Sequence, residues 1–184
     1  LPRRKEILAP WFAEMNAQPL GLDFFHRDTD FIDFNYQPTL PHKYTQYGPS
    51  ASVGDVNGDQ LDDIYLSGSA LENGAWFIQT RDGKFSRKNV SYKTNPDKLE
   101  EELGTLLFDA DNDGDLDLYI VRGSPQQPPG AALYQDILCA NDGRGNFTIV
   151  TQALPVETAC GQCVKAADFD GDGDLDLFVG GRVL

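Results

Sequence analysis

The chain has 184 residues, of which 40% are hydrophobic, so it is long enough to form one real core. Its formal net charge is −14 at pH 7, which makes nucleic acid and anionic membranes poor partners, because both are bound through clustered Lys and Arg. No run of 18 apolar residues is present to span a bilayer as a helix.

Residues 1–48 are expected to form an N-terminal segment that differs from the rest of the chain. Apolar residues between Arg3 and Asn16 follow a helical spacing that Pro10 interrupts, which predicts a short helix or two turns. A strand is predicted over 22–26, and aromatic residues then gather between 31 and 47. Aromatics beside polar residues could form a sugar-stacking shelf, but we favour a role in filling gaps in a core or anchoring a terminal strand against the last sheet.

From residue 49 to residue 184 the chain repeats one acidic nine-residue loop, at 55–63, 109–117 and 168–176. Oxygen-bearing side chains occupy positions 1, 3, 5 and 9 of each copy, an arrangement that wraps a short backbone around a hard divalent cation. So many carboxylates would repel one another strongly without a cation among them. The sequence therefore predicts three Ca²⁺ sites. The side chains expected to bind the metal are Asp55, Asn57, Asp59, Asp63, Asp109, Asp111, Asp113, Asp117, Asp168, Asp170, Asp172 and Asp176.

The flanks of these loops distinguish them from the calcium loops that lie between two helices. A loop of that kind ends on a bidentate Glu at position 12, whereas position 12 here is Leu66, Ile120 or Val179. Short runs rich in apolar residues stand before and after each loop, and glycines follow the second run. These are strand signals, so each predicted metal site lies in a tight turn between two strands.

The loops begin at residues 55, 109 and 168, so the repeats are 54 and 59 residues long. A strand-only repeat of this size is typical of propeller blades, in which a four-stranded antiparallel sheet takes about 40 to 50 residues. The predicted fold class is all-β, an incomplete propeller of about 2.5 to 3 blades. The expected blades are 49–103, 104–161 and a partial third, 162–184.

The second half of each complete repeat predicts a hairpin. Residues 75–79 are expected to pair with a strand at Phe85, and residues 132–138 with 147–150. Asp-Gly stands between the two runs in both cases, which favours a tight turn.

An acidic run at 95–102 has a separate interpretation. Asn95 as the N-cap, Pro96 in the first position and Asp97 in the first turn predict the start of a short helix. Its glutamates are expected to form a solvated face in the connection between two blades.

The three cysteines are Cys139, Cys160 and Cys163. A Cys-x-x-Cys pair could carry redox chemistry or bind zinc, but the βαβ context of the first and the further ligands of the second are missing. We expect a structural disulfide, either between Cys139 and one of the other two or within the Cys-x-x-Cys pair, because calcium sites of modest affinity imply an exported, oxidising setting.

Three stretches resemble a known family: 54–59, 141–147 and 167–177. They are similar to the FG-GAP or VCBS repeats, the integrin-type calcium-binding propeller blades, and most of all to those associated with an ASPIC/UnbV-type domain. The resemblance implies main-chain carbonyl ligands at loop position 7, and it implies about seven blades in a closed ring, so we expect the chain to continue beyond Leu184 or to have been cut there. The position-7 residues are Leu61, Asp115 and Asp174.

Position 6 of the first loop departs from the other two copies. It holds Gln60, where the other loops have Gly114 and Gly173. Gln60 must adopt a backbone conformation that glycine takes more easily, so the first site is expected to be somewhat weaker.

The sequence favours a non-enzymatic, exported module at the cell surface, outside the cell or in the periplasm, stiffened by calcium and binding a protein or glycan partner. One alternative is a scaffold for a polysaccharide-degrading enzyme, for which His26 or His42 with Tyr44 are the best candidate groups. Another is a subunit of an outer-surface assembly or uptake complex.

Overall fold

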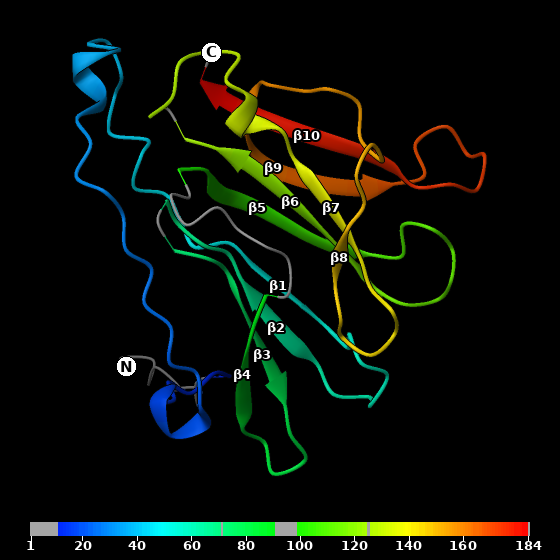
Figure 1. The fold of residues 1–184 in the computed structure, drawn as a ribbon. Helices are drawn as coiled ribbons and strands as arrows, with labels where there is room; N and C mark the ends of the chain where they lie inside the picture. The colour runs from blue at the N-terminus through cyan, green and yellow to red at the C-terminus, as the bar shows by residue number, and fades with distance from the viewer. Residues whose placement is uncertain (1–10, 71, 91–98, 125, 184) are drawn as a thin grey trace, which may run out of the picture.

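The computed structural model describes residues 11–70, 72–90, 99–124 and 126–183. Three antiparallel sheets stack side by side, and the chain visits them in order (Figure 1). The first sheet contains β1 (Ala51–Gly54), β2 (Asp63–Leu66), β3 (Ala75–Gln79) and β4 (Phe85–Asn89). The second contains β5 (Glu101–Phe108), β6 (Asp117–Gly123), β7 (Ile137–Ala140) and β8 (Thr148–Ile149), and the third β9 (Cys160–Ala167) and β10 (Asp176–Val183).

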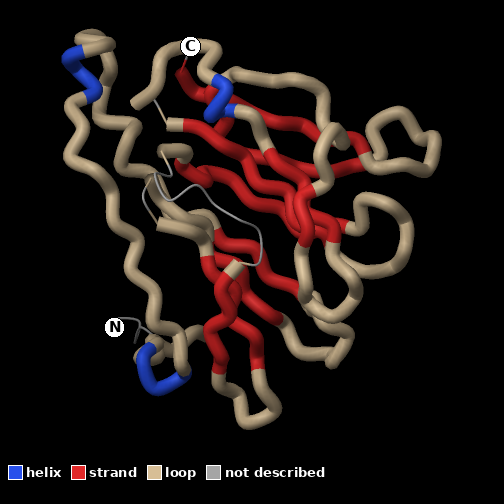
Figure 2. The backbone as a smooth tube through the Cα atoms, in the orientation of Figure 1, coloured by secondary structure: helices blue, strands red, loops and turns tan. Residues whose placement is uncertain are grey.

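Strand order equals chain order in both four-stranded sheets, so each is a simple up-and-down meander. Helical structure in the described residues is limited to three 3₁₀ turns, η1 (Gln18–Leu20), η2 (Asp33–Asn35) and η3 (Ala132–Tyr134), which Figure 2 shows in blue against the red strands. Sheets of this topology stacked face to face are partial propeller blades, and the predicted all-β fold class is confirmed.

The central strand β6 shows why the sheets stack. A strand alternates its side chains between two faces, yet β6 is buried almost throughout. Leu118 and Ile120 belong to a core shared with the first sheet, while Tyr119 and Val121 belong to a second core shared with β9. An apolar run without polar alternation is what a strand between two sheets requires.

The core between the first two sheets is largely aromatic. The ring of Trp76 from β3 stacks on that of Phe147 with centroids 4.5 Å apart and planes 12° apart. The ring of Tyr65 from β2 also packs against that of Trp76, with centroids 4.9 Å apart. Aromatic pairs of this kind stabilise by about 0.5–1.5 kcal/mol beyond the area that they bury.

Glycines allow the third sheet to approach the second. A Cβ on Gly123 in β6 would lie 2.1 Å from the carbonyl oxygen of Gly161 in β9, and a Cβ on Gly161 would lie 2.4 Å from Val121. A side chain on Gly123 would require the backbone of β9 to move, and a side chain on Gly161 would displace the buried side chain of Val121.

The N-terminal segment crosses the face of the first sheet instead of joining its edge (Figure 1). Phe24 packs edge-on against Phe77 of β3, with ring centroids 6.2 Å apart, and Arg87 of β4 donates to the carbonyl oxygen of Asp23. The strand predicted over 22–26 is therefore wrong, because side chains and not a backbone ladder hold this segment. The aromatics between residues 31 and 47, for which a core-filling role was expected, do not all fill a core, because Tyr36 is 72% exposed and Phe34 is 40% exposed.

The helix expected near the N-terminus is not found in the part that can be described. Residues 11–16 are irregular, and the first helical turn, η1, follows them. The remainder of that prediction, residues 3–10, lies outside the described residues.

The glutamates expected to be solvated are buried instead. Glu101 and Glu102 open β5, and Glu102 accepts hydrogen bonds from the Tyr65 hydroxyl and the Gly68 backbone N–H, both at 2.8 Å. Glu100 lies 3.5 Å from Arg122, which supplies a positive charge to this buried group. The helical interpretation fails here because donors from the first sheet satisfy the carboxylates; its other residues, 95–98, lie outside the described residues.

The strand predicted over 132–138 is shorter than expected. The chain first forms η3, in which the Tyr134 hydroxyl donates to the carbonyl oxygens of Ser124 (2.6 Å) and Gln127 (2.7 Å), and β7 begins only at Ile137. The hairpins themselves are confirmed, because β3 pairs with β4 and β7 with β8.

The expected disulfide is absent, and all three cysteines are free. Cys139 lies in the core between the first two sheets, whereas Cys160 and Cys163 lie on β9 of the third. The intervening second sheet separates the two environments.

Candidate metal centres

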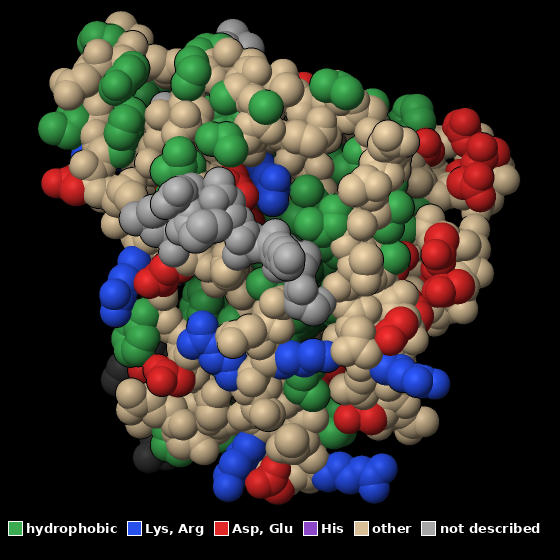
Figure 3. Space-filling view, viewed as in Figure 1, with side chains coloured by type: hydrophobic (Ala, Val, Ile, Leu, Met, Phe, Trp, Pro, Cys, Tyr) green, Lys and Arg blue, Asp and Glu red, His purple; other side chains and the backbone are tan. Residues whose placement is uncertain are grey.

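The three acidic loops connect the first two strands of each sheet and lie along one side of the molecule (Figure 1). Figure 3 shows acidic side chains gathered on that side, at the right of the view. Each loop thus begins at the end of the first strand of its sheet and leads into the second strand, to which the first is hydrogen-bonded.

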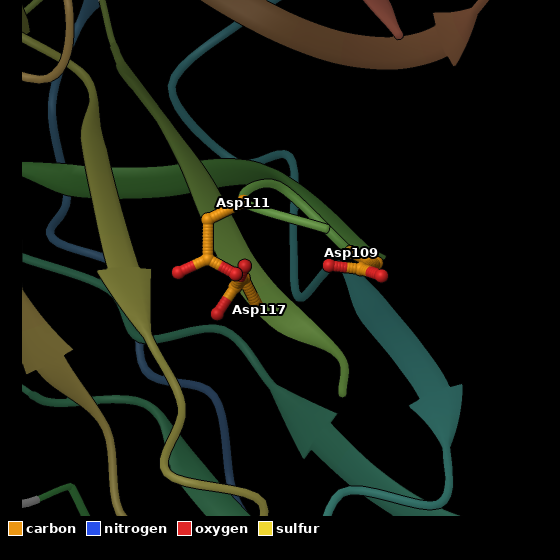
Figure 4. A group of neighbouring side chains, drawn as sticks. All are labelled: Asp109, Asp111 and Asp117. Carbon is orange, nitrogen blue, oxygen red and sulfur yellow. The ribbon is translucent and has the colours of Figure 1, made fainter. Parts of the chain in front are cut away.

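Two of the loops bring three carboxylates together. Carboxylate oxygens of Asp109, Asp111 and Asp117 lie within 4.8 Å of one another, and Figure 4 shows these side chains at the end of their sheet. The third loop gathers its trio, Asp168, Asp170 and Asp176, within the same limit. An all-oxygen donor set suits Ca²⁺, which takes six to eight hard oxygen ligands, so the residues fit this ion.

The first loop has an amide in place of one carboxylate. The Asn57 side chain donates its Nδ2 to Asp63 at 3.2 Å, and its Oδ1 accepts the Asp59 backbone N–H at 3.1 Å. Fewer negative charges meet here than in the other two loops.

The carboxylate at position 1 shapes each loop by accepting backbone N–H groups. Asp55 accepts from four residues, 57 to 60, at 2.8–3.2 Å. Burial acts to raise the pKa of Asp55, but these four donors outweigh it and lower the pKa. Asp109 and Asp168 each accept from the N–H of position 6, at 3.1 and 3.2 Å.

Position 6 takes up a left-handed backbone in all three loops. The φ angle is +69° at Gln60, +94° at Gly114 and +98° at Gly173. The conformation predicted for Gln60 is confirmed. In this conformation the Cβ of a residue with a side chain is sterically disfavoured, whereas glycine has no Cβ.

The carboxylate at position 9 ties each loop to its sheet. Asp63 accepts from the N–H of Val56 in the loop (3.3 Å) and from that of Gln79 at the end of β3 (2.8 Å). Asp117 accepts in the same way from the backbone N–H of Ala110 in its loop (2.9 Å) and from that of Asn141 after β7 (2.8 Å). The corresponding Asp176 accepts from its loop at 2.9 Å but is exposed, because its sheet has only two strands.

Repulsion within the loops is visible in the pKa directions. Burial raises the pKa of Asp63, and the charges of Asp59 and Asp55 add to the rise. Desolvation and then the charge of Asp113 raise the pKa of Asp111 and of Asp115. A bound cation would reverse these effects by favouring the ionised carboxylates.

The remaining predicted ligands keep regular positions in the loops. The position-5 carboxylates of Asp59, Asp113 and Asp172 each accept the backbone N–H of position 7 at 3.0–3.1 Å. The position-7 carbonyls of Leu61, Asp115 and Asp174 stay predicted ligands.

Asn141 connects the first two loops, and sequence reasoning missed it. Its Nδ2 donates to the carbonyl oxygens of Val56 in the first loop (2.8 Å) and of Leu116 in the second (3.1 Å). The motif that contains Asn141 predicted a hairpin turn and carried part of the family resemblance, but a bridge between two blades depends on contacts that no local pattern reveals.

The groups considered for an enzyme site have other partners. His26 pairs with Asp28 at 2.9 Å. His42 packs against Tyr44, with ring centroids 4.7 Å apart, and hydrogen-bonds to Tyr47.

Among the described residues, no helix has the length and apolar character needed to cross a bilayer.

Comparison with known sequence families agrees with this geometry. The FG-GAP-like repeat matches the chain twice, over residues 55–120 and 109–179. Each match begins at the first aspartate of an acidic loop and runs past the next loop, and together they span more than half of the chain. The chain therefore belongs to the FG-GAP-like repeat family, whose repeats form β-propeller-like modules. No curated protein matches it.

Proposed function

We propose that this chain is part of an exported β-propeller that is stabilised by calcium and binds a protein or glycan partner without catalysing a reaction. The observation that carries the proposal is the meeting of three aspartates within 4.8 Å in each of two loops. These carboxylates repel one another, and a divalent cation converts that repulsion into attraction.

In this proposal the cation joins the ends of two strands in each blade. The ligands are the residues at positions 1, 3, 5, 7 and 9 of the three loops. Because the unfolded chain does not preform these sites, the binding free energy contributes to the free energy of folding. Export follows from the affinity range of such loops, since sites of modest affinity fill only where calcium is abundant.

Chelation tests the proposal. A ligand that binds only the folded state at 100 times its Kd stabilises by about 2.7 kcal/mol. For a chain of this size such a change corresponds to roughly 5–10 °C in melting temperature per site. We expect excess EDTA to lower the melting temperature by at least that amount, as followed by circular dichroism.

Single substitutions separate the sites. Asp113→Ala and Asp172→Ala should each lower the melting temperature in excess calcium and have little effect in EDTA. Asp62→Ala is the matched control, because Asp62 is an exposed carboxylate of the first loop outside the ligand positions. An identical melt with and without EDTA would falsify the calcium role.

A further inference from the structure

A groove of about 650 Å³ lies away from the acidic loops, at the start of β9. Three separate segments line it: residues 31–40 of the N-terminal segment, residues 126–134 around η3, and residues 158–160. The opposite end of β9 leads into the third acidic loop, so the groove and that loop are one strand length apart. The volume falls within the range of small-ligand sites, about 300–1,000 Å³.

An aromatic shelf forms one part of the lining. The rings of Phe31 and Tyr36 stack with centroids 5.1 Å apart and planes 19° apart. Tyr36 is nevertheless 72% exposed, so its second ring face is open. An aromatic face is electron-rich and attracts the weakly positive C–H groups on the apolar face of a sugar ring.

Uncommitted polar groups face the same space. Gln127 and Thr158 line the groove from different segments, and their side chains make no hydrogen bond to the described part of the chain. An amide and a hydroxyl both donate and accept, as the hydroxyls of a sugar do. The hydroxyl of Tyr134 is not available in this way, because it already donates to backbone carbonyls.

The charges of the groove exclude other ligand classes. Among the residues that the structure describes, its lining contains no Lys, Arg or His, so an anionic ligand finds no counter-charge there. Asp33, the carboxylate in the described part of the lining, is buried and accepts from Tyr44 and from both the backbone and the hydroxyl of Thr45. A cationic ligand would have to compete with these donors, which leaves a neutral ligand.

We propose that this groove binds a neutral saccharide, with one sugar ring stacked on Tyr36 and its hydroxyls hydrogen-bonded to Gln127 and Thr158. The inference rests on the proposed function as a binding module and names the ligand class and the site. A proline-rich peptide suits the groove less well, since it offers few hydroxyls to pair with these two side chains.

The experiment uses the full 184-residue chain in excess calcium on an array of immobilised neutral oligosaccharides. The unmodified chain is expected to be retained by at least one oligosaccharide. Tyr36→Ala should weaken that binding by about tenfold, the equivalent of about 1.4 kcal/mol, and Thr158→Val should weaken it less. Trp11→Ala is the control, because Trp11 is 91% exposed and does not line the groove.

Several results would overturn the inference: no retention on any neutral oligosaccharide, equal retention of Tyr36→Ala, or retention only on charged sugars or proline-rich peptides. Melting curves with and without EDTA are recorded for every variant. A chain that binds no sugar but loses stability in EDTA refutes the groove alone. A chain that binds sugar through Tyr36 but is insensitive to EDTA refutes the calcium role alone.

Discussion

Individual aspartates in this chain serve different purposes, and their neighbours decide which. Asp33 and Asp63 are both buried and both accept backbone N–H groups. Asp63 has other carboxylates nearby, and its pKa is raised, whereas Asp33 accepts from the backbone of Tyr44 and from the backbone and hydroxyl of Thr45. Asp33 therefore acts as an internal clamp that fixes residues 44 and 45 to η2, without any need for a metal.

The clamp at Asp33 predicts a pH dependence. Burial alone would raise the pKa of Asp33, but the hydrogen bonds from Thr45 and Tyr44 outweigh it and lower the pKa below 3.8. Folding then favours the ionised carboxyl, so its contribution is present above pH 3.8 and is lost as the pH falls through the folded-state pKa. Asp33→Asn should cost about 1.5–3 kcal/mol near neutral pH.

Urea unfolding in EDTA checks this prediction without interference from calcium. The difference between the unmodified chain and Asp33→Asn should shrink as the pH is lowered from neutral towards 3. Asp30→Asn is the control, because the Asp30 side chain is 91% exposed. A difference that stays constant over this range would argue against an ionised clamp.

At the scale of elements, each blade consists of strands and one acidic loop. Hydrogen bonds from the hairpin of the second blade join that blade to the first. Gly145 and Asn146 of the second sheet's hairpin accept from Lys88 Nζ of β4, at 2.7 and 3.0 Å. Asn141 in the same hairpin reaches both acidic loops. Ordering one loop thus helps to place the other.

We predict that calcium binding at the first two loops is coupled through Asn141. Removing the amide in Asn141→Ala leaves the carbonyls of Val56 and Leu116 with one donor fewer each, at a cost of about 1–3 kcal/mol. Calcium titration by calorimetry should then show independent binding in place of positive cooperativity. Arg144→Ala, at the exposed tip of the same hairpin, should leave the isotherm unchanged; cooperativity that survives Asn141→Ala would contradict the coupling.

At the scale of the whole molecule, the two outer faces of the stack differ. The N-terminal segment covers the outer face of the first sheet through Phe24 and Phe77. The third sheet keeps Phe178 of β10 70% exposed, although the neighbouring Leu177 packs into the core with the second sheet. One face is closed by the chain itself, and the other presents apolar side chains to the surroundings.

The net charge of −14 predicts a salt effect that depends on calcium. Without calcium the acidic loops repel one another along one side, and raising the salt concentration screens this repulsion, since the Debye length falls from about 10 Å at 0.1 M to about 3 Å at 1 M. The melting temperature in EDTA should therefore rise with sodium chloride more steeply than it does in calcium. Parallel salt dependences in the two conditions would contradict this view, and Asp113→Ala should reduce the slope in EDTA.

The features that the sequence predicted correctly are those encoded locally. The loop spacing and the flanking apolar runs predicted the two complete sheets, the partial third and the left-handed Gln60. Each depends on residues that are neighbours in the chain, so alternation and turn chemistry were sufficient.

The errors came from residues whose environment is supplied by distant parts of the chain. Glu102 was assigned to a solvated helix, but Tyr65 and Gly68 of the first blade provide donors that draw it into β5. The segment at 22–26 has a strand-like composition, yet Phe77 holds it across a face where no backbone ladder forms.

The amino-acid sequence by itself determined the family, the repeat and the acidic loops, because ligand spacing and hairpin signals are short-range properties of the chain. Only the tertiary structure decided that Asn141 joins two loops, that Cys139 lies in a different environment from Cys160 and Cys163, and that Phe31, Gln127 and Thr158 line one groove. These relations exist only after the sheets have stacked, since burial and hydrogen bonding between blades are set by the packing of segments far apart in the sequence.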